Sequence, residues 1–337
     1  MSPTSTLWSR ILGAVGSSAA TGHIGTSALR DEEAPAQRFR TDNDSSDTFT
    51  LPDGRKIGYA QYGSLTGRPI LYMHGFPGSR LEAAGFDRVG QEVGARIIAV
   101  DRPGVGWSSP HAGRTLLDLP KDVERLARHL GLESYSVLGI SGGGPYVLAC
   151  AAALPREKLK CASIVVGLGP PDIGMSGADW LHRLGFPHGL RYAPFSIVKR
   201  FWQSDPSGRL DLGEDERLKL VLQSPVRHEK DAAFMKSDWP RLSLRAVGEC
   251  YTQGFDGIFQ DGRLICSDFG FQVEDIRSDL PLHLWYGKLD TFVPSNHGVQ
   301  IAARWRGKVQ LKVEDETHAS IVVNRSREIL AALTEQT

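Results

Sequence analysis

The sequence predicts an α/β fold built around a mainly parallel sheet. From residue 51 onward, short apolar and β-branched runs alternate with helical segments, which is typical of βαβ units. Right-handed crossovers between such units place successive strands parallel to each other. With 337 residues, of which 41% are hydrophobic and 23% charged, the chain can bury a core of ordinary size. The predicted strands are residues 56–62, 69–73, 95–100, 135–140, 159–166, 280–286 and 309–313.

Helices with one apolar face are predicted between and after these strands. In residues 118–130, apolar side chains recur every three or four positions from Leu119 to Leu130, as in an amphipathic helix packed on a sheet. Further helices are predicted at 145–154, directly after a strand, and at 325–333 near the C-terminus.

The first 50 residues are predicted to be disordered. Residues 1–30 are rich in Ser, Thr, Gly and Ala and contain no acidic residue, whereas residues 31–50 are polar and acidic. Such a composition does not bury enough apolar surface to order the backbone. A basic, Ser-rich and acid-poor start also resembles a mitochondrial transit peptide. The four cysteines show no CxxC spacing and favour a reducing compartment, so we expect a cytoplasmic protein, with a mitochondrial location as the alternative.

Residues 170–276 interrupt the alternation of strands and helices. This segment has a high aromatic content and contains several helical patterns, at 195–203, 214–222 and 240–251. We interpret it as a helical cap inserted into an α/β core made of residues 51–169 and 277–337.

Charge and motif content exclude several classes of function. The 39 basic and 39 acidic residues balance to zero net charge, which disfavours a nucleic-acid partner. No apolar run approaches 18 residues, so no membrane-spanning segment is predicted. The cysteines and histidines lack metal-ligand spacing, and the Gly-rich loops lack the Lys-Ser/Thr pair of a phosphate-binding loop. We therefore expect a small-molecule substrate and no metal or cofactor.

Ser141 stands in the strongest local motif of the chain. Gly139 and Gly143 flank it two residues away, as G-x-S-x-G, with a strand before the motif and a helix after it. In this context the serine occupies a sharp turn whose tightness requires the neighbouring glycines. Its hydroxyl then projects at the sheet edge, near the positive end of the following helix. We predict that Ser141 is a nucleophile.

A serine nucleophile needs a base that takes its proton and an acid that orients the base. Asp290 follows the strand 280–286, and His318 follows the strand 309–313. Parallel strands bring these positions to the same sheet edge as Ser141, and the order Ser, Asp, His is the one this architecture uses. We predict Asp290 as the acid and His318 as the base.

Other residues remain open for both partner roles. His297 begins a helix seven residues after Asp290, whereas His283 lies within a strand. His182, His188 and His228 lie in the inserted segment without metal-ligand spacing. Among acids, Asp268 and Asp275 compete with Asp290.

An oxyanion hole requires two backbone N–H groups about 3 Å from the developing negative oxygen. Gly142, the residue after the nucleophile, is one candidate donor. The other is Phe76, in the His-Gly-Phe-Pro-Gly loop after the strand 69–73, and its ring would also line the pocket. His74 is expected to brace this loop, and Trp107, in the loop after the strand 95–100, is a candidate for the pocket wall.

Together these motifs resemble the α/β-hydrolase superfamily over residues 51–337. The resemblance rests on the His74–Gly78 loop, the Asp-Arg-Pro-Gly sequence from Asp101, the serine motif, the Gly-x-x-Asp ending at Asp290, and His318. It implies an eight-stranded, mostly parallel sheet with a late helical cap. Epoxide hydrolases and haloalkane dehalogenases share the loop but use aspartate where Ser141 stands, so this departure argues against both.

The implied reaction is cofactor-independent hydrolysis of an ester-type bond through an acyl-enzyme. The aromatic cap favours a small to medium, largely apolar substrate. Carbon–carbon bond hydrolases, hydroxynitrile lyases and acyltransferases resemble this constellation too. A non-catalytic ligand receptor on the same fold is a further alternative.

Overall fold

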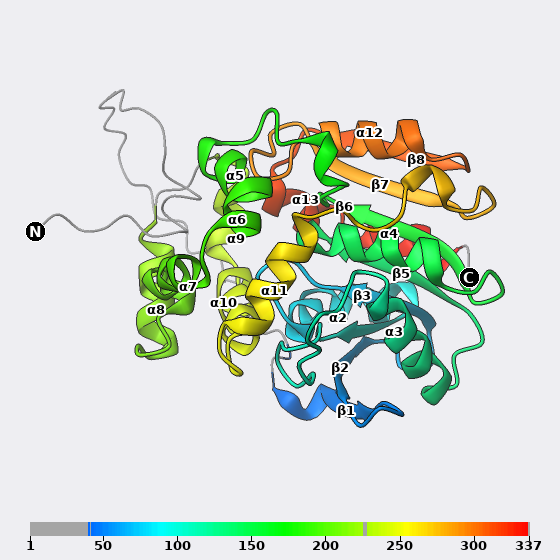
Figure 1. The fold of residues 1–337 in the computed structure, drawn as a ribbon, viewed down its shortest axis with the longest axis horizontal. Helices are drawn as coiled ribbons and strands as arrows, with labels where there is room; N and C mark the ends of the chain where they lie inside the picture. The colour runs from blue at the N-terminus through cyan, green and yellow to red at the C-terminus, as the bar shows by residue number, and fades with distance from the viewer. Residues whose placement is uncertain (1–39, 41, 225–227, 336–337) are drawn as a thin grey trace, which may run out of the picture.

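The computed structural model describes residues 40, 42–224 and 228–335. These residues form one sheet of eight strands in the order β1-β2-β4-β3-β5-β6-β7-β8 (Figure 1). The strands are β1 Ser46–Thr50, β2 Lys56–Gly63, β3 Arg68–Met73, β4 Ala95–Val100, β5 Tyr135–Ile140, β6 Leu159–Val165, β7 Leu282–Gly287 and β8 Val309–Glu314.

The predicted α/β fold with a mostly parallel sheet is confirmed. Every neighbouring pair from β4 and β3 through to β8 runs parallel, whereas β1 and β2 join the edge in antiparallel pairs. The seven predicted strands all form, with ends that differ from the prediction by at most two residues. The parallel strands therefore present their carboxyl ends along a common edge.

The prediction of disorder is wrong for the last residues of the N-terminal segment. Ser46–Thr50 form β1, which pairs with β2 so that Ser46 faces Ala60 and Thr50 faces Lys56. Ladder hydrogen bonds satisfy the backbone whatever the side-chain composition. The ring of Phe49 also stacks on His129, with centroids 4.5 Å apart. The prediction for residues 1–39 lies outside the described residues.

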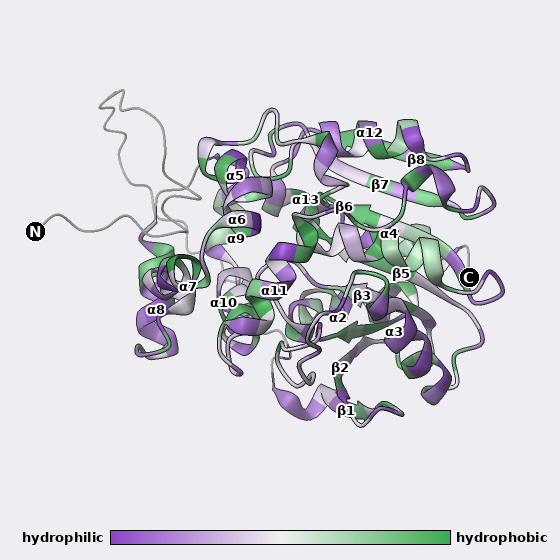
Figure 2. Ribbon diagram, viewed as in Figure 1, coloured by the Kyte–Doolittle hydropathy of each residue, from purple (hydrophilic) through white to green (hydrophobic). Residues whose placement is uncertain are grey.

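Helices cover both faces of the sheet, and Figure 2 shows apolar residues along its central strands. Residues alternate along β3, so Leu71 and Met73 belong to one buried cluster and Ile70 and Tyr72 to the other. All four cysteines are buried free thiols, as small core residues would be. The first cluster includes residues of α3 Asp118–His129, α4 Gly144–Ala153 and α12 Asn296–Arg304. The second includes residues of α13 His318–Asn324 and α14 Ser326–Thr334, and α2 Asp87–Val93 packs beside α14.

Between β6 and β7 the described residues form helices joined by loops and no strand, and we call these helices the cap. They lie beside one end of the sheet in Figure 1, and several of them line the cavity at the strand ends. The division into core and cap residues stays an interpretation. The cap helices are α5 Trp180–Leu184, α6 Leu190–Tyr192, α7 Phe195–Ser204, α8 Glu214–Leu222, α9 Asp231–Lys236, α10 Trp239–Cys250 and α11 Asp256–Ile265.

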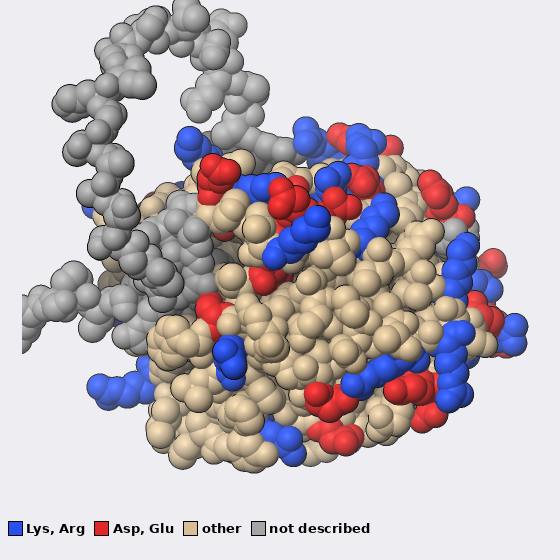
Figure 3. Space-filling view, turned by 90° about the horizontal axis from the view of Figure 1, so that it is seen from above, with Lys and Arg blue, Asp and Glu red and all other residues tan. Residues whose placement is uncertain are grey.

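Charges of both signs are mixed over the surface. On the face shown in Figure 3, basic and acidic side chains stand next to each other around a broad area that carries neither. This agrees with the zero net charge of the sequence. Of the helices in the described residues, none combines the length and the apolar character that crossing a bilayer requires.

Candidate active site

Ser141 occupies a strained turn between β5 and α4. Its φ is +52°, in the left-handed region that non-glycine residues rarely adopt. The turn is tight because a Cβ added to Gly143 would lie 2.2 Å from the carbonyl oxygen of Met73, and one on Gly139 would lie 2.5 Å from Val147 Cγ2. The G-x-S-x-G spacing is therefore a steric requirement here, and it leaves Ser141 at the wall of the cavity.

Asp290 and His318 contact each other directly. His318 Nδ1 lies 2.7 Å from Asp290 Oδ2, and Asp290 is 5% exposed. The other carboxylate oxygen, Oδ1, accepts the N–H groups of Phe292 at 2.7 Å and Val293 at 3.0 Å. These backbone bonds orient the carboxylate toward His318, whose Nδ1–H donates to it.

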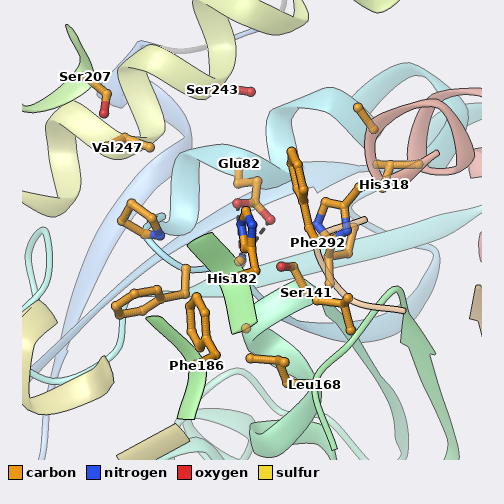
Figure 4. A pocket seen from close by; sticks show the side chains of 18 of the residues that line it. Glu82, Ser141, Leu168, His182, Phe186, Ser207, Ser243, Val247, Phe292 and His318 are labelled. Atoms are coloured by element: carbon orange, nitrogen blue, oxygen red, sulfur yellow. Dashed lines mark hydrogen bonds between the residues drawn. The ribbon is translucent and has the colours of Figure 1, made fainter. Parts of the chain in front are cut away.

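His318 is the first residue of α13, and the helix start determines its position. The Thr317 hydroxyl accepts the N–H of Ser320 at 3.1 Å, while the Ser320 hydroxyl accepts the N–H of Thr317 at 2.8 Å. This reciprocal cap holds the first helical turn in place. The local sequence Thr-His-Ala-Ser thus presents the imidazole to the cavity, where it lies near Ser141 and Phe292 (Figure 4).

The two candidate oxyanion donors lie side by side. A Cβ added to Gly142 would come within 3.0 Å of the Phe76 nitrogen and 2.4 Å of the Phe76 Cβ. Only glycine permits this approach of the two backbones. The Phe76 ring lines the cavity, as predicted, and packs edge-on against Phe186 with centroids 6.0 Å apart.

Buried polar groups brace the loop that carries Phe76. His74 Nδ1 donates to the carbonyl oxygen of Gly75 at 2.9 Å, and Arg102 donates to the same oxygen at 2.7 Å. Glu82 accepts the N–H of Gly75 at 3.0 Å. Burial, together with the charge of Arg102, holds the pKa of His74 well below its usual value. The His74 ring is therefore neutral and well suited to the predicted bracing role.

The cavity at the strand ends has a volume of about 210 Å³. Besides Ser141 and His318, its wall contains the polar side chains of Glu82 and His182, visible at the centre of Figure 4. Most of the remaining lining is apolar and includes Leu168, Met175, Phe186, Val247, Phe292 and Val293. Such a site suits a substrate with an apolar body and a few polar groups.

The prediction of Trp107 in the pocket wall is wrong for this cavity. Its ring lies under the guanidinium of Arg80, whose Cζ is 4.2 Å from the ring centroid. The backbone N–H of Trp107 donates to Asp101 Oδ2 at 2.9 Å. Both contacts hold Trp107 in the turn after β4, and Trp107 is not among the residues that line the cavity.

Sequence reasoning missed Glu82 and did not assign His182 to the site. Glu82 accepts a hydrogen bond from the Tyr72 hydroxyl at 2.6 Å, and burial raises the pKa of its carboxyl. His182, on α5, pairs with Asp179 at 2.8 Å and stacks on Phe292 with centroids 4.6 Å apart. An acid shortly after the His-Gly-Phe-Pro-Gly loop was a usable signal for Glu82. For His182 there was none, since its place depends on how the cap folds back.

Apart from His182, the competing residues His297, His283, Asp268 and Asp275 do not line the cavity. His297 is buried, and its Nδ1 accepts the N–H of Gly169 at 3.0 Å. His283 lies within β7, and neither Asp268 nor Asp275 lines the cavity. In the described part of the chain, no group of three or more His, Cys, Asp or Glu side chains is arranged to hold a metal ion.

Comparisons with known proteins agree with this architecture. The family model described as alpha/beta hydrolase fold matches residues 68–324. A proline iminopeptidase of Xanthomonas citri is 36% identical over 108 residues, which are 31% of this chain and 34% of that protein. The match thus spans about a third of that relative. A Mycoplasma pneumoniae protein, named only provisionally as a proline iminopeptidase, is 29% identical over 78% of this chain and 88% of its own length.

Solved structures add support for the fold alone. An esterase from Exiguobacterium antarcticum superposes with a TM-score of 0.57 at 19% sequence identity. The superposition covers 86% of this chain and 98% of the esterase.

Proposed function

Because the chain belongs to the α/β-hydrolase family, we propose that it is a serine hydrolase that cleaves an ester-type bond of a small to medium, largely apolar substrate. The observation that supports this most directly is a single cavity lined by Ser141, His318 and Phe76. In it the histidine is paired with Asp290, and the backbones of Phe76 and Gly142 approach each other.

The proposed reaction begins with proton transfer from Ser141 Oγ to His318 Nε2. Asp290 accepts the Nδ1–H of His318, which leaves Nε2 free as the base and stabilises the imidazolium. The serine oxygen attacks the carbonyl carbon, and the N–H groups of Phe76 and Gly142 donate to the oxyanion. His318 then protonates the leaving alcohol. Water, deprotonated by His318, attacks the acyl-enzyme, and the Ser141 oxygen leaves with the proton.

The direct test removes the Ser141 hydroxyl. Ser141→Ala is expected to abolish hydrolysis of short p-nitrophenyl esters and covalent labelling by a fluorophosphonate, with an unchanged circular dichroism spectrum. Ser243→Ala, which alters another serine of the cavity wall, is the matched control and keeps both activities. Retention of most turnover in Ser141→Ala would refute the nucleophile, and a wild type that is neither labelled nor active would favour a non-catalytic receptor.

A second candidate is a peptidase that acts on a substrate with a free, protonated imino group. The name of the curated relatives supports it, and so does Glu82, a carboxyl group in the cavity wall beside the Phe76 loop. A carboxylate there can pair with an ammonium next to the scissile carbonyl. Turnover of proline p-nitroanilide, compared with its N-acetyl derivative and with a p-nitrophenyl ester, distinguishes the two activities.

A further inference from the structure

We propose that Asp261, on the cap helix α11, is a positioning residue for the oxyanion hole, acting through Arg102 on the backbone of the loop that carries Phe76. This inference rests on the proposed function. It means that the cap helps to position the oxyanion hole for the chemical step, in addition to covering the substrate.

Arg102 connects the cap to that loop. Its two terminal nitrogens donate to the carbonyl oxygens of His74 at 2.6 Å and Gly75 at 2.7 Å. Its Nε lies 2.8 Å from Asp261 Oδ2. The side chains of Arg102 and Asp261 are both completely buried, so water does not replace either partner. The contact is an ion pair without hydrogen-bond geometry, so the charge of the carboxylate holds the guanidinium beside the two carbonyl groups.

The same carboxylate contacts the helix that follows the nucleophile. Asp261 Oδ1 accepts from Arg114 at 2.9 Å and from the hydroxyl of Tyr146, to which Arg114 also donates at 2.8 Å. Tyr146 is a residue of α4, which begins three residues after Ser141. One side chain of the cap thus joins the loop of Phe76 to the helix next to Ser141.

Packing reinforces this connection. A Cβ added to Gly262, the neighbour of Asp261, would lie 2.9 Å from Cζ of the Phe76 ring. Helix α11 therefore lies directly on the residue whose N–H is to donate to the oxyanion. Because close-packed groups transmit displacement, a shift of α11 moves Phe76 relative to Gly142.

The charge balance keeps Asp261 ionised. Burial alone would raise the pKa of Asp261, but the charges of Arg102 and Arg114 lower it. Removing the negative charge leaves the buried guanidinium groups of Arg102 and Arg114 without the ion-pair partner they share. The carbonyl oxygens of His74 and Gly75 are then held less firmly.

Glu249 provides a matched control from the same cap. It lies on α10 and pairs with Arg80 at 2.7 Å, another carboxylate that ties the cap to a buried arginine. Arg80 contacts Asp101, Ser46 and Asn43, and donates to neither carbonyl group of the Phe76 loop. Glu249→Gln thus weakens cap attachment without reaching the oxyanion hole.

The test compares Asp261→Asn, Arg102→Lys and Glu249→Gln in the full chain. Lysine keeps the charge of Arg102 but does not reach both carbonyl groups and Asp261 at once. Arg102→Lys therefore still tests the inference if Asp261→Asn fails to fold. The readouts are kcat and KM for a p-nitrophenyl ester, the fluorophosphonate labelling rate, and Tm. We expect kcat and the labelling rate to fall about 10- to 100-fold in the first two variants with KM within about threefold, and kcat of Glu249→Gln to stay within about twofold.

The inference is overturned if Arg102→Lys and Asp261→Asn keep kcat within about twofold of the wild type. It is also overturned if Glu249→Gln loses as much kcat at a similar loss of Tm, since a purely structural role would do that. A wild type that is neither active nor labelled would instead refute the proposed function, and this inference with it. An active wild type with unaffected variants refutes the inference alone.

Discussion

At the scale of single residues, burial favours the neutral form of two neighbouring ionisable groups and therefore shifts their pKa values in opposite directions. His74 is held neutral, since its pKa lies well below the usual value, and its Nδ1–H braces the loop of Phe76. Glu82 braces the same loop from the cavity side, but burial raises the pKa of its carboxyl. Its charge therefore depends on pH in a range above the usual value of 4.5.

The substitution Glu82→Gln separates the bracing of the Phe76 loop by Glu82 from any role of its negative charge. The amide oxygen still accepts from Tyr72 and Gly75, so ester turnover is expected to stay within about threefold. If Glu82 binds an ammonium group of the substrate, turnover of proline p-nitroanilide by Glu82→Gln is expected to fall at least about tenfold. A loss of this size corresponds to the free energy of one hydrogen bond between charged groups. The wild-type activity on this cation then also falls as pH drops through the raised pKa, because the carboxylate is lost. Equal losses on both substrates would mean that Glu82 only braces the loop.

At the scale of elements, β1 shows how a polar segment becomes ordered through its partner. Its sequence Ser-Asp-Thr-Phe-Thr has a single large apolar residue, Phe49, yet all five residues pair with β2. Arg80 adds a hydrogen bond from its Nε to the Ser46 hydroxyl at 2.9 Å. The strand thus extends the sheet beyond the parallel strands.

Phe49→Ala tests how much this edge strand contributes to stability. The ring is partly buried against the core and stacks on His129, so its loss is expected to lower the free energy of unfolding by about 2 kcal/mol. Urea denaturation measures the change. Thr50→Ala, at an exposed position of the same strand, should change it by no more than about 0.5 kcal/mol. Equal effects of both substitutions would contradict a packing role for Phe49.

At the scale of the whole molecule, buried neutral histidines make stability depend on pH. His297 on α12 accepts the N–H of Gly169, and burial lowers its pKa from 6.5 to about 4. In the unfolded chain the imidazole takes up a proton below its ordinary pKa, whereas the folded chain resists protonation until about pH 4. The unfolded state then binds more protons, so stability is complete above pH 6.5 and falls as the pH drops.

His297→Asn should remove this part of the pH dependence. Asparagine still offers an oxygen to the N–H of Gly169 but does not titrate in this range. Between pH 7 and pH 5 the wild type is expected to lose about 2 kcal/mol more unfolding free energy than the variant. Urea denaturation of both proteins at the two pH values measures this difference. Parallel losses would show that His297 titrates normally.

The sequence by itself determined the α/β sheet and the order of its strands along the chain. Apolar runs and amphipathic spacing are local properties, and local patterns suffice to predict such elements. Parallel strands meet at one edge, so strand-end positions also predicted that Asp290 and His318 lie together, as their 2.7 Å contact shows. The catalytic roles of these residues and of Ser141 stay predictions.

Only the tertiary structure decided which distant residues complete the site. Asp261 meets Arg114, 147 positions away, and the places of His182 and Glu82 in the cavity depend on how the cap and the Phe76 loop pack. The strand β1 and the position of Trp107 likewise depend on the partners they pack against, β2 and Arg80, and not on their own sequence patterns. Such contacts cannot be predicted from a periodic pattern in the sequence. The role of each of these residues depends on which part of the folded chain packs against it.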